Sequence, residues 1–191
     1  MPVPTEARPR FVPDAPLPPY SYVPGRFPHP MSDPAGHLFG KPPERPPAPD
    51  PHHWGESRAY LYGLDLFNFG YYWEAHEVWE GLWHACGRTG PTADFFRGLI
   101  KLAAAGVKVR QGVPAGVASH AARAAAVFRS AAERLGGDDA RFFGLRIGDL
   151  LAYSRAVEAM APTVESDRED GVKIVFPFVL LPQDDNTVVN R

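Results

Sequence analysis

Residues 67–88, FNFGYYWEAHEVWEGLWHACGR, decide the fold that this 191-residue sequence predicts. They hold two His, three Glu, the sole Cys and three of the four Trp. The pattern predicts an amphipathic helix over 71–86, with glycine on both sides of it. The side chains expected to face the core are Ala75, Val78, Trp79 and Leu82.

Helical patterns continue on both sides of this stretch. Gly and Pro separate four further segments, at 56–69, 92–111, 115–135 and 148–160. A short turn or helical piece is expected at 138–143. The sequence therefore predicts an all-α fold, a compact bundle of about five helices.

Proline divides the chain into parts. Of 22 Pro, 17 lie between positions 2 and 51, where the missing backbone donors disfavour helix and central strand. We therefore expect a Pro-rich extended arm and spacer at 1–53, a helical bundle domain at 54–161 and an extended tail at 162–191. Within the tail, VKIVFPFVLLP favours β structure but is interrupted by Pro177, so it is expected to be an extended strap.

Aromatic residues recur through the N-terminal arm, whereas flexible linkers are usually poor in them. We expect them to pack on the bundle or on a second copy of the chain, which predicts a homo-oligomer formed through the arm. These aromatics are Phe11, Tyr20, Tyr22, Phe27 and Phe39.

Composition argues against several classes of protein. The 20 basic and 22 acidic residues give no basic surface for nucleic acid. The longest apolar run, 98–107, contains Lys101 and is much shorter than the roughly 20 residues of a membrane span, so no membrane partner is expected. A single Cys excludes an internal disulfide and fits a cytoplasmic protein.

The helix over 71–86 also carries a polar stripe. Glu77, Glu80 and His84 point away from the predicted core, and Glu74 and His76 lie at its margins. His76 and Glu80, and also Glu80 and His84, are four residues apart, close enough on a helix to share one metal ion. The metalloprotease motif H-E-x-x-H is absent, because Glu80 stands where the second His is required.

Three readings of the stripe remain open. It can bind a ligand or a metal, with His29 and His37 of the arm as additional metal ligands. It can be catalytic, with Lys101 as a neighbouring cation. It can also be a structural ion network, in which Arg97, Lys101 and Lys108 of the next helix pair with the Glu residues.

Other residues give weaker signals. Cys86 is expected to be a small packing residue, and His120, which has no visible partner, is expected to be solvated or to cap a contact. A tetratricopeptide array is a weak alternative, because the inter-helix glycines at 70 and 112 are 42 residues apart rather than 34.

Two motifs carry a resemblance to a known family. Glu74 to Glu77 read E-A-H-E, and Gly98 to Ala105 read G-L-I-K-L-A-A-A after a short connection. In this order they resemble the prokaryotic helical family called domain of unknown function 309. The resemblance implies a compact helical bundle and no particular activity.

The function expected from these observations is a ligand- or partner-binding module, and the alternative is a metal-assisted hydrolase. The ligand-binding candidates are Glu74, His76, Glu77, Glu80, Trp83, Lys101 and Lys108. The catalytic candidates are Glu74, His76, Glu77 and Lys101, and the metal candidates are His76, Glu80, His84, His29 and His37.

Overall fold

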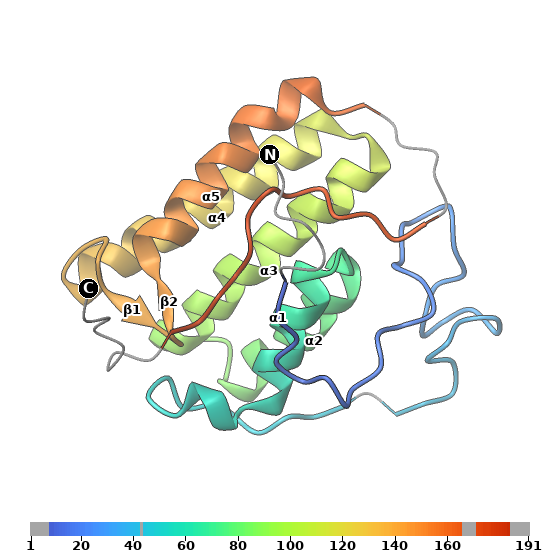
Figure 1. Cartoon of the computed structure of the whole chain (residues 1–191), viewed down its shortest axis with the longest axis horizontal. Helices are drawn as coiled ribbons and strands as arrows, with labels where there is room; N and C mark the ends of the chain where they lie inside the picture. Colours follow the sequence, from blue (N-terminus) through green and yellow to red (C-terminus); the bar gives the residue numbers. More distant parts are fainter. Residues whose placement is uncertain (1–7, 43, 166–170, 184–191) are drawn as a thin grey trace.

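The computed structural model describes residues 8–42, 44–165 and 171–183, and it confirms the all-α prediction (Figure 1). The residues at 1–7, 43, 166–170 and 184–191, which belong to the predicted arm and tail, lie outside this part. Five helices form the bundle: α1 (Arg58–Asn68), α2 (Tyr72–Ala85), α3 (Gly90–Gln111), α4 (Pro114–Leu135) and α5 (Ile147–Met160). Short 3-10 turns precede α1 (Trp54–Glu56) and follow α5 (Ala161–Thr163).

The helix limits follow the Gly and Pro signals. Gly112 and Gly136 end α3 and α4 with φ of +67° and +91°, a left-handed conformation that glycine adopts without steric cost. Pro91 and Pro114 lie in the first turns of α3 and α4, where a missing backbone donor costs nothing.

The segment between α4 and α5 differs from the expected helical piece. Strands β1 (Arg141–Phe142) and β2 (Leu145–Arg146) pair as a small antiparallel hairpin. Its two-residue turn consists of Phe143 and Gly144, with φ of +53° and +72°, the signs that a tight primed hairpin turn requires. Burial of the Phe143 ring among Tyr60, Phe95 and Phe96 compensates for its unusual backbone conformation.

Glycines let neighbouring helices approach closely. Gly63 of α1 lies against the Trp79 ring, Gly98 of α3 against Phe128, and Gly106 against Tyr72. Each helix packs mainly on the next one in sequence, so α2 and α3 lie side by side and α3 lies beside α4. This order brings polar side chains of α2, α3 and α4 to one side of the bundle.

The described part of the arm packs on the helices of its own chain. Asp65 of α1 is fully buried and accepts hydrogen bonds from the backbone N–H groups of Phe11 and Val12, at 2.7 and 2.9 Å, and from Arg10 Nε at 3.1 Å. Figure 1 shows the arm in blue, following the α1 and α2 side of the bundle. The oligomer expected through the arm stays a prediction.

Residues 171–183, called the strap below, form an extended segment between α5 and the α1/α2 pair (Figure 1). Phe176, Phe178 and Leu180 are buried in the core. The Asn68 side chain both donates to the Leu180 carbonyl, at 3.0 Å, and accepts from the Leu180 N–H, at 2.9 Å. The Asn68 side-chain amide thus satisfies the backbone N–H and C=O of Leu180, which a neighbouring strand would satisfy in a sheet. None of the described helices is long and apolar enough to cross a membrane.

Candidate functional site

Helix α2 presents the faces that its sequence predicts, with two differences, at Val78 and Glu74. Ala75, Trp79 and Leu82 are fully buried, whereas Val78 is only partly covered. Glu74, predicted at the margin, is 5% exposed and belongs to the buried side. The arm covers this carboxylate and removes it from water.

His76, Glu77 and Glu80 come together on the half-buried side of α2. One ligand atom from each lies within 4.8 Å of the other two, and we call these residues the His–Glu–Glu group. His76 Nδ1 lies 3.3 Å from Glu77 Oε1. This nitrogen is buried, and among the described residues it has no hydrogen-bond partner, so its contact with Glu77 is electrostatic only.

The other three metal candidates lie outside this group. His84 is exposed, and its Nδ1 accepts a hydrogen bond from Arg88 Nε at 2.8 Å. His29 and His37 are held in the arm by ring contacts, His29 with Trp73 and Tyr22 at 5.3 and 5.1 Å, and His37 with Tyr20 at 4.8 Å. The arm thus reaches α2 at Trp73, but its His residues do not join the group.

Glu74, on the same helix, has a raised pKa. Its Oε1 accepts a hydrogen bond from the Tyr22 backbone N–H at 2.7 Å, while Oε2 is buried with no hydrogen-bond partner in the described residues. Burial raises the pKa of Glu74 to about 7, an effect that the Tyr22 hydrogen bond opposes and the charge of Glu77 reinforces. The carboxyl therefore exchanges its proton near neutral pH, the range that suits a general acid or base.

The cations of α3 do not form the expected ion network with α2. Arg97 pairs with Asp94 at 2.9 Å, and Lys108 Nζ donates to Gln111 Oε1 at 2.7 Å. In the part of the chain that the structure describes, no ion pair joins Lys101 or Lys108 to an α2 carboxylate. Both lysines are half-buried on the side of α3 that faces α4 and the polar side of α2.

His120 of α4 is a member of this region that the sequence alone did not identify. It is half-buried rather than solvated, and its Nδ1 is buried without a hydrogen-bond partner among the described residues. Burial lowers the pKa of His120, and the nearby positive charges of Lys101, Lys108 and Arg123 lower it further. A faint sequence signal is Gly116, one turn before His120. A Cβ there would lie 2.8 Å from Lys108 Cδ, so the glycine lets Lys108 lie across α4.

Two further residues of the stretch have structural surroundings. Trp83 packs partly against the core, and the Arg88 guanidinium lies 5.7 Å from its ring centroid. Cys86 is half-buried, and burial raises the pKa of its thiol, so it is not an activated nucleophile.

Comparison with known proteins agrees with the two sequence motifs. Residues 60–120 match the model of a family described as Domain of unknown function (DUF309), which confirms the resemblance. This segment runs from α1 into α4 and contains the His–Glu–Glu group, Lys101, Lys108 and His120. No curated protein matches the chain.

Proposed function

We propose that this chain is a ligand-binding helical module built around one divalent cation. Its residues 60–120 match the DUF309 family. The cation is held by the His–Glu–Glu group on α2. The observation that carries the proposal is the approach of three donor atoms, from one imidazole and two carboxylates, to within 4.8 Å of one another.

The size of the group suits a small metal ion. Around a tetrahedral zinc, two ligands that are each about 2.1 Å from the metal lie about 3.4 Å apart, so donors within 4.8 Å of one another need to approach by up to about 1.4 Å, which rotation of the side chains can supply. The spacings His76 to Glu77 and His76 to Glu80 fix all three donors on one rigid helix. Two carboxylates balance the charge of a divalent cation, and a mixed nitrogen and oxygen set favours Zn²⁺ or Mn²⁺ over Ca²⁺.

The surroundings of the group indicate an anionic ligand. Three protein donors leave at least one coordination position of the metal open. A ligand can reach this position from solvent, because the side chains of His76 and Glu77 are 27% and 30% exposed. Lys101 and Lys108, together with Arg123, supply positive charge on the adjoining helices. An anion that reaches the metal is therefore attracted by these cations as well.

A metal-assisted hydrolase is the second candidate, and one observation favours it. Glu74, with a pKa of about 7, lies one turn before Glu77 and influences it electrostatically. A metal-bound water and a carboxyl that exchanges its proton at neutral pH are the two components that hydrolysis requires. Because the arm covers Glu74 at Tyr22, this activity requires that the arm lift at that point.

Metal binding by protein purified without a His tag tests the proposal. We expect Zn²⁺ or Mn²⁺ to bind with one ion per chain by calorimetry and elemental analysis. Binding should be lost in His76→Ala and Glu80→Gln. His84→Ala is the matched control, because His84 lies on the same helix outside the group. Metal binding that is equal in Glu80→Gln and His84→Ala would contradict the proposal.

A hydrolytic role is tested separately. The metal-loaded protein is assayed with general phosphoester and carboxyl ester substrates, and Glu74→Gln is compared with the unaltered chain. We expect a hydrolase to lose activity in Glu74→Gln while its metal stoichiometry is unchanged. A metal-loaded protein without such activity leaves the binding module as the function.

A further inference from the structure

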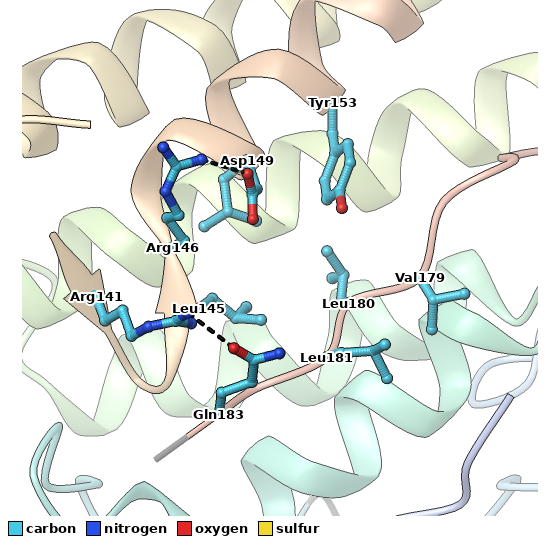
Figure 2. Close-up of a pocket in the computed structure, with 10 residues that line it drawn as sticks. Arg141, Leu145, Arg146, Asp149, Tyr153, Val179, Leu180, Leu181 and Gln183 are labelled. Carbon is cyan, nitrogen blue, oxygen red and sulfur yellow. Dashed lines mark hydrogen bonds and ion pairs between the residues drawn. The ribbon is translucent and has the colours of Figure 1, made fainter. Parts of the chain in front are cut away.

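A second site is formed by elements that do not contribute to the α2 region. A pocket of about 150 Å³ lies between the β1/β2 hairpin, α5 and the strap (Figure 2). Polar and apolar atoms contribute about equally to its wall. The aliphatic side chains that line it are Leu145, Leu150, Val179, Leu180 and Leu181.

The two arginines of the pocket differ in their charge balance. Arg146 is neutralised, because its Nη2 donates to Asp139 Oδ1 at 2.5 Å and its Nη1 to Asp149 Oδ1 at 2.8 Å. Arg141 donates only to neutral acceptors, the Gly144 carbonyl at 3.1 Å and Gln183 Oε1 at 2.8 Å. Among the described residues it has no carboxylate partner.

Arg141 also retains hydrogen-bonding capacity. A guanidinium carries five N–H donors, and two of them are used here. Figure 2 shows the guanidinium directed into the ring of lining residues, toward Gln183. Counting only the described residues, the pocket therefore offers a positive charge without a carboxylate partner, with donors suited to a carboxylate, beside aliphatic side chains.

Tyr153 gives the apolar part a flat and rigid wall. Its ring stacks on Phe178 with 4.1 Å between the centroids and 1° between the planes. Burial raises the pKa of the Tyr153 hydroxyl, and the charge of Asp149 raises it further, so the side chain stays neutral. A flat neutral wall beside aliphatic side chains suits an aromatic or branched body.

From this combination we propose that the pocket binds a small monocarboxylate with an apolar body, its carboxylate on Arg141 and its body against Leu181 and Tyr153. The pocket volume of about 150 Å³ equals that of a cavity that accommodates a benzene ring, which sets the size of the body at about one aromatic ring. A more highly charged anion such as phosphate is disfavoured for two reasons. The Asp149 carboxylate, which lines the same pocket, repels it, and the aliphatic side chains of the wall give its additional oxygens no hydrogen-bond donor. The site does not depend on metal binding at α2.

Calorimetry or saturation-transfer NMR on the unaltered full-length protein tests the proposal with three probes. Benzoate has the proposed charge and body, benzamide has the body without the charge, and acetate has the charge with almost no body. We expect benzoate to bind at least about tenfold more tightly than either control, the range of one charge-assisted interaction. Equal binding of benzoate and benzamide, or no binding of benzoate, would overturn the proposal.

Substitutions then locate the site. Arg141→Gln retains a donor and removes the charge, so we expect it to weaken benzoate binding by about tenfold and leave benzamide unaffected. Arg155→Gln is the matched control, because Arg155 is exposed on α5 and does not line the pocket. Equal benzoate affinity in the two variants would place binding elsewhere. If Arg141→Gln disturbs the hairpin, the three-probe comparison on the unaltered chain still decides the question.

Discussion

The Tyr22 backbone amide donates to the Glu74 carboxylate over 2.7 Å and so joins the Pro-rich arm to the helix that carries the candidate site. The two residues are 52 positions apart in the sequence. Burial of Glu74 raises its pKa to about 7 and the Tyr22 hydrogen bond opposes this shift, so docking of the arm and the protonation state of Glu74 are linked.

The first prediction concerns stability against pH. The folded pKa of Glu74 lies above its ordinary value of 4.5, so its contribution to stability is fully present below about pH 4.5 and lost as the pH rises through about 7. Relative to Glu74→Gln, the unaltered protein should lose up to about 3 kcal/mol of unfolding free energy between these limits. Urea unfolding at pH 4.5, 6 and 8 measures this difference. Glu133→Gln, at an exposed position on α4, is the control and should keep the pH dependence of the unaltered chain.

The second prediction concerns the attachment of the arm to α1. Asp65→Asn should cost about 2–4 kcal/mol, because it removes a buried charge that accepts from two backbone N–H groups and from Arg10. Amide exchange at Phe11 and Val12 should accelerate together with this loss. Asp14→Asn is the control, since Asp14 pairs with Arg58 at the exposed surface, and it should change little. Equal effects of the two variants would show that the buried contacts do not anchor the arm.

The third prediction concerns the close approach of α1 and α2. A Cβ at Gly63 would lie 2.2 Å from Trp79 Nε1, so Gly63→Ala should destabilise the protein by about 1–3 kcal/mol through overpacking. Gly81→Ala is the matched control, because the nearest atom to its Cβ, Pro46 Cδ, is 3.5 Å away. The control should be neutral or slightly stabilising, since Ala favours helix over Gly. Thermal unfolding of both variants checks the pair, and a tolerated Gly63→Ala would contradict the observed packing.

The fourth prediction distinguishes the candidate site from a structural ion network. In the described structure no ion pair joins Glu77 to Lys101. The effects of Glu77→Gln and Lys101→Met on stability should therefore add to within about 0.5 kcal/mol in a double-mutant cycle. A larger coupling energy would restore the network as the explanation of the polar cluster.

Local patterns predicted most of the helices and placed His76 and Glu80 on one side of α2. The helix expected over 71–86 is observed at Tyr72–Ala85, because its apolar spacing and its flanking glycines agree. His76 and Glu80 were identifiable as metal candidates for the same reason, since spacing along one helix fixes their separation, whereas Glu77 was identified only as a ligand-binding and catalytic candidate.

Contacts between distant segments were not predictable in the same way. Strands of two residues are too short to show an alternating pattern, and the left-handed conformation of Phe143 depends on the core that receives its ring. The position of His120 depends on how α4 packs against α3. The burial of Glu74 depends on where the arm docks, which the spacing along α2 does not encode.

The contacts of Arg8 impose an order on how this chain completes its structure. Its guanidinium donates to the carbonyls of Asn68, at 3.0 Å, and of Phe176 and Phe178 in the strap, at 3.3 and 3.2 Å. A chain leaves the ribosome from its N-terminus, so Arg8 emerges long before the carbonyls of the strap exist. Arg8 therefore has no strap acceptors for most of synthesis, and its contacts with the strap form only after Phe176 and Phe178 have left the ribosome.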